Sequence, residues 1–151
     1  MQNEECSYFS TVKIFIKSDN GVSLKNWSGH ILFNEDFQWK DLERAFPELW
    51  DIVVSETKQN QEEAQYDQIS MELNLQEIRK NRKPFGYFKD GSKFRMIFPE
   101  GRKEIIVYRG TLTEELHDLM EKLSKVLKAK KLKFTVEYDN MLLHEIRKRR
   151  K

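Results

Sequence analysis

The chain has 151 residues, of which 34% are charged and 38% hydrophobic, and its formal net charge is +2. This length fits one domain, and the 10 Phe, 5 Tyr and 3 Trp exclude a largely disordered chain, because aromatic side chains bury large apolar areas. A single cysteine, Cys6, excludes an internal disulfide, and no apolar run approaches the roughly 18 residues of a membrane span, so we expect a cytoplasmic or nuclear protein.

Two strands are expected near the amino terminus. Residues 12–16 alternate between apolar and polar side chains, and residues 19–21 carry a turn signal. Residues 28–33 form the second expected strand. The first part of the chain therefore predicts a piece of β-sheet.

The next segment predicts a short helix and then an ambiguous apolar run. Asn34 fits the N-cap of a helix over residues 35–46, and Pro47 fits its end. The buried side of this helix would carry Phe37, Leu42 and Phe46. Residues 49–57 contain an Ile-Val-Val run that fits either a strand or a helix, and we favour a strand.

The middle of the chain predicts a loop, a strand and a second loop. Residues 58–65 are the most polar window, and residues 69–75 alternate cleanly, which is typical of a half-buried strand. A basic loop then ends this strand at residues 79–84. Its candidate binding residues for a polyanion or an acidic partner are Arg79, Lys80, Arg82 and Lys83.

A hairpin and a meander are expected next. Asp90-Gly91 is a favoured two-residue turn between residues 85–88 and 93–98. A second turn at residues 99–101 leads to a strand over residues 104–108. Together these segments predict a three-stranded antiparallel meander.

The clearest helix is expected to begin near Thr111, which fits a capping box with Glu114. Apolar residues recur at helical spacing from Leu112 to Leu127, and they form one stripe. Residues 132–138 then alternate as a last strand, and residues 141–146 fit a helical turn. The whole pattern predicts an α+β fold: a mostly antiparallel sheet against one long helix in the carboxyl-terminal half.

Motifs for catalysis are absent from the sequence. His30, His117 and His144 lie far apart, and none has a second His or a Cys at metal-ligand spacing. His117 is expected on the solvated side of its helix, and His30 is expected to make an ordinary strand hydrogen bond. There is no nucleophile elbow and no phosphate-binding glycine loop. We therefore expect no cofactor, no metal and no enzyme activity, although a site built from distant residues is a weaker alternative.

Two short segments resemble the RNA-recognition motif family. Residues 14–18 (IFIKS) resemble its first-strand signature, and residues 83–88 (KPFGYF) resemble the start of its third-strand signature. The resemblance implies that Phe15, Phe85 and Tyr87 stack on bases. Pro84 stands where that family has Gly, so core packing of these aromatic residues is the alternative.

Residues 87–127 resemble the closing part of a polo-box domain. The shared order is an Asp-Gly strand, a Pro-acid-Gly turn, a second strand and a Leu-rich helix. This resemblance implies a non-catalytic protein-interaction module of six antiparallel strands and a helix, often dimeric and linked to centriole or mitotic assembly.

The charge is distributed unevenly along the chain. Residues 122–151 hold 11 Lys/Arg and 3 Asp/Glu, a net of +8, whereas the other residues hold 16 and 22, a net of −6. The sequence thus predicts one domain over residues 1–146 and a basic tail over residues 147–151. The binding residues of the tail would be Arg147, Lys148, Arg149, Arg150 and Lys151.

These features predict a non-catalytic, intracellular protein-interaction or adaptor module. The acidic body and basic tail also allow copies of the chain to associate with each other. The alternative is a nucleic-acid-binding protein that uses the basic tail and the loop at residues 79–83, because phosphate contacts require only charge and reach.

Overall fold

The computed structural model describes residues 27–55, 61–89, 91–109 and 113–139. Its elements are β1 (Ser28–Phe33), the 3-10 helix η1 (Trp39–Leu42), α2 (Phe46–Ser55), α3 (Gln61–Arg79), β2 (Arg95–Ile97), β3 (Glu104–Tyr108), α4 (Thr113–Ala129) and β4 (Phe134–Asp139). They confirm the expected α+β class. The features expected at residues 12–16, 19–21 and 141–146, and the basic tail, lie outside the described residues.

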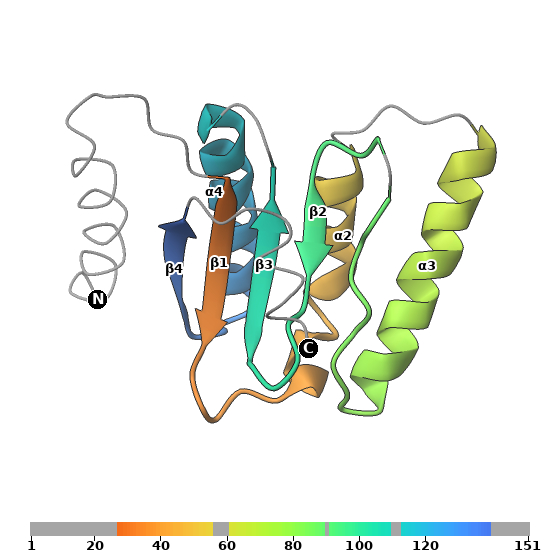
Figure 1. Ribbon diagram of the computed structural model, residues 1–151. Coiled ribbons are helices and arrows are strands. Elements are labelled where there is room, and N and C mark those ends of the chain that lie inside the picture. The colour runs from red at the N-terminus through yellow and green to blue at the C-terminus, as the bar shows by residue number, and fades with distance from the viewer. Residues whose placement is uncertain (1–26, 56–60, 90, 110–112, 140–151) are drawn as a thin grey trace.

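The four strands form one antiparallel sheet in the order β2-β3-β1-β4 (Figure 1). β1 lies between β3 and β4, and Ile31 is opposite both Ile105 and Val136. Directly opposite residues share a face of a sheet, so these three side chains point toward the same side. All three are buried there.

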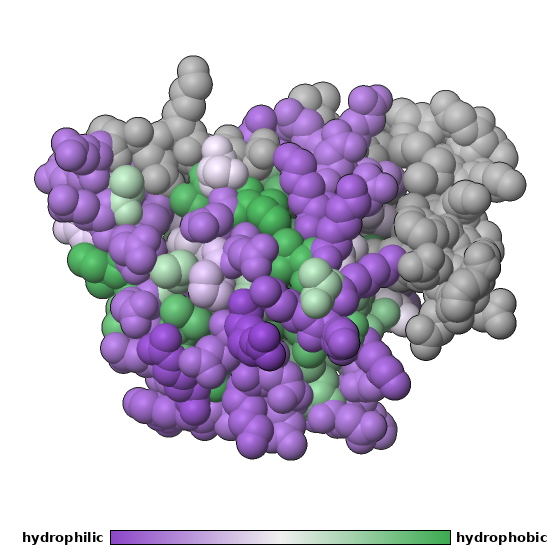
Figure 2. Space-filling view, turned by 180° about the vertical axis from the view of Figure 1, so that it is seen from behind, coloured by the Kyte–Doolittle hydropathy of each residue, from purple (hydrophilic) through white to green (hydrophobic). Residues whose placement is uncertain are grey.

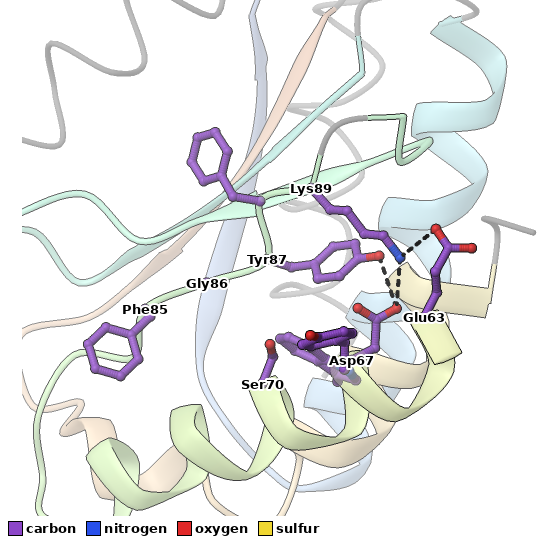
Figure 3. Close-up of a pocket in the computed structure, with 10 residues that line it drawn as sticks. Glu63, Asp67, Ser70, Phe85, Gly86, Tyr87 and Lys89 are labelled. Atoms are coloured by element: carbon purple, nitrogen blue, oxygen red, sulfur yellow. Dashed lines mark hydrogen bonds and ion pairs between the residues drawn. The ribbon is translucent and has the colours of Figure 1, made fainter. Parts of the chain in front are cut away.

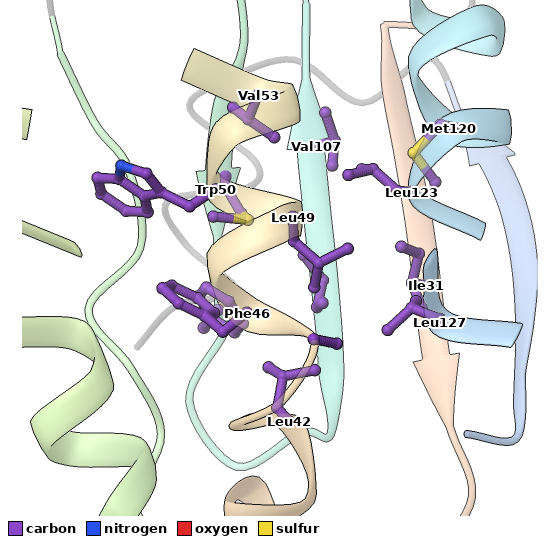
Figure 4. Packing of buried hydrophobic residues seen from close by; sticks show 14 of the residues in the cluster. Ile31, Leu42, Phe46, Leu49, Trp50, Val53, Val107, Met120, Leu123 and Leu127 are labelled. Carbon is purple, nitrogen blue, oxygen red and sulfur yellow. The ribbon is translucent and has the colours of Figure 1, made fainter. Parts of the chain in front are cut away.

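Helices α2 and α4 cover this face of the sheet (Figure 1). Side chains from both helices converge on the sheet between Ile31 and Val107 (Figure 4). Each fully buried aliphatic or aromatic side chain contributes about 1.5–3 kcal/mol to folding. The expected apolar stripe of α4 is confirmed, since the helix buries Leu116, Leu119, Met120, Leu123 and Leu127.

The expectation of a strand at residues 49–57 is wrong, because this run belongs to α2. Its buried residues, Phe46, Leu49, Trp50 and Val53, recur at the spacing of one helix face. Pro47 lies in the first turn of α2, where a missing N–H costs no helical hydrogen bond. The short helix expected over residues 35–46 is limited to η1, although Phe37, Leu42 and Phe46 are buried as expected.

Helix α3 replaces both the loop expected at residues 61–65 and the strand expected at residues 69–75. The alternation that suggested a strand comes from apolar residues on two opposite sides of a helix. Leu75 and Ile78 are buried, whereas Ile69 and Leu73 are exposed. Glu, Gln, Met and Leu, which favour helices, dominate this segment.

The expected hairpin before β2 is reduced to an isolated bridge between Tyr87 and Met96. β2 itself has three residues and pairs with β3, so only this part of the meander is a continuous ladder. The expected turn after β2 is present, and Gly101 adopts a positive φ of 71° there.

Ion pairs attach the first turn of α4 to the sheet. Glu115 lies 3.2 Å from Nζ of Lys93 and 2.8 Å from a terminal nitrogen of Arg109. The hydrogen bond from Lys93 and the charge of Arg109 hold the pKa of Glu115 below its ordinary value. Arg109 also donates to the carbonyl oxygen of Lys93 at 3.0 Å, so β3, residue 93 and α4 are joined at one end of the sheet.

His117 is not the solvated side chain that the sequence predicts. It is half-buried on α4, and its ring packs against Tyr138 of β4 with a centroid distance of 4.0 Å. Burial lowers the pKa of His117, and the carboxylates of Asp118 and Glu121 partly oppose this effect. The folded protein therefore disfavours the protonated form of His117 relative to the unfolded chain.

This environment predicts a pH-dependent stability. The unfolded chain binds a proton at His117 near pH 6.5, whereas the folded chain binds it only at lower pH. The free energy of unfolding should therefore fall as the pH falls below about 6.5. Urea unfolding of the wild type and of His117→Gln at about pH 7.5 and about pH 5.5 measures this contribution. The wild type should lose more stability than the variant, and equal losses would contradict the prediction.

Candidate functional site

A cleft of about 440 Å³ lies between α3 and the extended segment at residues 85–89 (Figure 3). Trp50 of α2 contributes to its inner wall. Aromatic and charged side chains both line it, which is typical of sites that orient a ligand with a few polar groups. The lining residues are Trp50, Glu63, Tyr66, Asp67, Ser70, Phe85, Gly86, Tyr87, Phe88 and Lys89.

Asn74 and Gly86 fix the two walls of the cleft to each other. The buried Asn74 side chain accepts a hydrogen bond from the Gly86 N–H at 2.7 Å and donates to the Ser70 carbonyl at 2.8 Å. Gly86 has a positive φ of 97°, and a Cβ atom there would lie 2.4 Å from the Met96 carbonyl oxygen. Only glycine fits this position without strain.

A polar cluster lies at one end of the cleft. The buried Asp67 side chain accepts a hydrogen bond from the Tyr87 hydroxyl at 3.3 Å. Nζ of Lys89 lies 3.6 Å from Asp67 and 3.5 Å from Glu63, and Figure 3 shows its side chain reaching toward both carboxylates. Glu63 and Asp67 stand four residues apart on α3, so one side of the helix carries both acids.

The aromatic residues of the cleft divide into buried and exposed members. Tyr87 is 3% exposed and meets Trp50 edge to face at 5.1 Å between ring centroids. Phe85, by contrast, is 57% exposed, and it points away from the polar cluster in Figure 3. The guanidinium of Arg95 lies 5.6 Å from the centre of the Phe88 ring.

Helix α3 exposes a second apolar surface beside the cleft. Tyr66, Ile69 and Leu73 are 69%, 58% and 47% exposed. Their spacing places them on one side of the helix, opposite the side that buries Leu75 and Ile78. We call these three side chains the outer stripe of α3. Figure 2 shows hydrophobic surface among hydrophilic side chains at the edge of the molecule that α3 forms. Tyr66 also lines the cleft, so the two features adjoin.

The helix that carries the outer stripe is acidic. α3 carries five carboxylates against one guanidinium, a net charge of −4. The acids of α3 are Glu62, Glu63, Asp67, Glu72 and Glu77, and its only base is Arg79.

The predicted basic loop begins at the end of this acidic helix. Arg79 donates a hydrogen bond to Glu43 at 2.9 Å and lies 3.5 Å from Glu72, and Arg82 lies 3.5 Å from Glu77. The hydrogen bond to Glu43 raises the pKa of Arg79 further above neutrality. Lys80 is exposed and Lys83 is half-buried. Carboxylates therefore partly compensate the charge of this loop.

The three predicted stacking residues have different surroundings. Phe85 is exposed at the cleft, but Tyr87 is buried against Trp50, so its ring offers no open face to a base. Phe15 lies outside the described residues, as do all five basic tail residues.

A buried chain of hydrogen bonds crosses the other face of the sheet. Oγ of Ser28 lies 2.8 Å from Nε2 of His30, whose Nδ1 lies 2.5 Å from Oε2 of Glu104. These distances match those of a nucleophile, a base and an orienting acid. However, Ser28 is 0% exposed and belongs to a strand that is paired on both sides, so the sheet leaves no backbone donors for an oxyanion. The arrangement fits a structural link between β1 and β3, and His30 makes strand hydrogen bonds as the sequence predicts.

Three further observations concern metal ions, membranes and known proteins. Within the described ranges, no group of three or more His, Cys, Asp or Glu side chains is placed to hold a metal ion. No helix in this part of the chain is long and apolar enough to cross a membrane. Comparison with protein-family models, curated proteins and solved structures gives no match.

Proposed function

We propose that this protein is a non-catalytic protein-interaction module whose docking surface is the outer stripe of α3 together with the adjoining cleft. The observation that carries the proposal is the exposure of Tyr66, Ile69 and Leu73 on one side of a single helix. Scattered exposed apolar residues are normal, but a contiguous apolar strip rimmed by polar residues is typical of an interaction site. The resemblance of residues 87–127 to a polo-box domain agrees with such a role.

The charge of α3 favours a basic partner. Two copies that paired through this helix would bring together two helices that each have a formal net charge of −4, which like-charge repulsion disfavours. A basic amphipathic segment of another protein offers an apolar face for the stripe and cations for its acidic rim. We therefore place the partner in a different protein.

Substitution of the outer stripe tests this function. Ile69→Ser/Leu73→Ser should weaken binding of a basic amphipathic peptide about tenfold or more, because exposed apolar anchors carry much of the energy of an interface. Gln65→Ser/Gln68→Ser is the matched control, since both glutamines are exposed on the same helix. Fluorescence anisotropy measures affinity for peptides that share one apolar face and differ only in the charge of the polar face. Equal affinity of both variants, or no preference for basic peptides, would contradict the proposal.

Nucleic-acid binding is the alternative that the same assay excludes or supports. Labelled RNA and DNA are titrated with the full chain and with a chain that ends at Ile146. Binding that is steep in salt and requires residues 147–151 would favour nucleic acid, since each phosphate contact adds to the salt slope. Peptide binding that depends on α3 and survives moderate salt would favour the docking surface.

A further inference from the structure

We propose that the cleft beside α3 is a receptor for an arginine side chain of the protein partner, and that Lys89 competes with this arginine from within the chain. This inference rests on the proposed function and assigns a chemical class of ligand to one part of the docking surface. It adds a specificity-determining site to a surface whose affinity comes mainly from apolar contact.

The charge balance of the cleft favours a cation. Glu63 and Asp67 supply two negative charges, and Lys89 supplies one positive charge among the lining residues. An ionised carboxylate accepts hydrogen bonds at several lone-pair sites, so two carboxylates can hold more than one cationic group. The contacts of Lys89, at 3.5 Å and 3.6 Å, are longer than the roughly 2.7–2.9 Å of a strong charge-assisted hydrogen bond. The lysine therefore binds its two acids loosely.

The walls of the cleft favour arginine over lysine. Tyr66 and Phe85 present exposed aromatic rings at its rim, whereas Trp50 and Tyr87 pack on each other and close its inner wall. A guanidinium is planar and weakly hydrated, so it stacks on rings while its N–H groups donate to carboxylates. An ammonium is strongly hydrated, and it loses more solvation in an aromatic-walled cleft.

Lys89 has the position of a built-in competitor. Its side chain is one quarter exposed, but its ammonium nitrogen is buried against the acids that the arginine would use (Figure 3). Because the lysine is attached to the segment that forms one wall of the cleft, its local concentration is high. An incoming guanidinium must therefore displace it or share the two carboxylates with it.

The probe is N-acetyl-arginine N-methylamide, with the neutral citrulline analogue as its control. Each compound is titrated into the ¹⁵N-labelled full chain, and amide chemical shifts are followed by NMR. The arginine compound should shift amides at residues 63–70 and 86–89 with a dissociation constant on the order of millimolar, as expected for a small ligand. Citrulline should bind at least about tenfold more weakly, since it lacks the charge.

Two variants should change the affinity in opposite directions, and a third is their control. Lys89→Gln should bind the arginine compound about threefold to tenfold more tightly, because the competitor is removed. Glu63→Gln should bind it about tenfold more weakly, because a charge-assisted contact is lost. Glu72→Gln is the matched control: it removes the same charge from α3 at a position that does not line the cleft. A merely structural role of Lys89 would not produce a gain in affinity.

The outcomes separate this inference from the proposed function. Equal shifts with arginine and citrulline, or weaker binding by Lys89→Gln, would overturn the receptor. If amphipathic peptides still bind and still require the outer stripe, the docking function survives that failure. A chain ending at Ile146 tests the source of the arginine. If this truncation tightens binding of the arginine compound, the cleft of the full chain holds Arg147, Arg149 or Arg150 instead of an arginine of the partner. Unchanged binding supports the partner as the source.

Discussion

Gly86→Ala should lower the free energy of unfolding by about 2–4 kcal/mol, because it combines a strained backbone with a steric clash. The φ of Gly86 is 97°, and the new Cβ atom would lie 2.4 Å from the carbonyl oxygen of Met96. That oxygen accepts the backbone hydrogen bond of Tyr87 at 2.8 Å, so it cannot move away without breaking the bridge to β2. Relief of the clash would also move Gly86 from Asn74, and the cleft would lose its shape.

Gly91→Ala is the matched control for this variant. Gly91 has a similar φ of 84°, but nothing lies within 4 Å of its hypothetical Cβ atom. It should therefore show only the backbone cost, about 1 kcal/mol. Urea unfolding measures both free energies, and binding of the arginine compound reports the cleft. Gly86→Ala should lose that binding and Gly91→Ala should keep it, so equal stability losses would contradict the role of the close contact.

Glu104→Leu should lower the free energy of unfolding by about 3–5 kcal/mol, the usual cost of removing one partner from a buried polar pair. Glu104 is buried, and its carboxylate lies 2.5 Å from Nδ1 of His30 and 3.0 Å from Nε of Arg102. An ionised carboxylate only accepts hydrogen bonds, so Nδ1 of His30 donates to it. Without Glu104, this buried N–H group has lost its acceptor.

His30→Leu/Glu104→Leu separates the loss of the pair from the loss of packing. Replacement of both members by apolar side chains removes the orphaned donor, so the double variant should recover part of the stability that Glu104→Leu loses. Glu104→Leu, His30→Leu, the double variant and the wild type form a double-mutant cycle. We expect an interaction of at least about 1 kcal/mol between the two positions. Strictly additive losses would show that the hydrogen bond does not couple them.

The sequence predicts β1, β3 and the buried side of α4 well. β1 and β3 have the expected bounds although both of their faces are buried, and the stripe of α4 is buried as its spacing requires. The sequence pattern does not indicate the helix α3, because this helix carries apolar residues on two sides. One side packs on the domain and the other forms the outer stripe. A helix with two apolar sides can have apolar residues at alternating positions, and this pattern is the same as that of a half-buried strand.

The candidate site was missed for the same reason. If residues 58–65 are a loop, the sequence gives no reason for Glu63 and Asp67 to lie close together, because residues four apart lie on the same side only in a helix. The sequence predicts Phe85 and Tyr87 as stacking residues, but only the fold shows that the first ring is exposed and the second is buried. The Gly in the Phe-Gly-Tyr run was the one local sign of a special backbone position.

The central position of β1 also determines when the domain completes its fold during synthesis. Both hydrogen-bonded neighbours of β1 are made much later: β3 begins at Glu104 and β4 at Phe134. Pairing Ser28 with Asp139 closes a loop of more than 100 residues, whose entropy must be lost before the sheet gains stability. A nascent chain that ends before β4 would thus expose one edge of β1. We expect folding to be slow relative to helical domains of this size, and to finish only after residue 139 has left the ribosome.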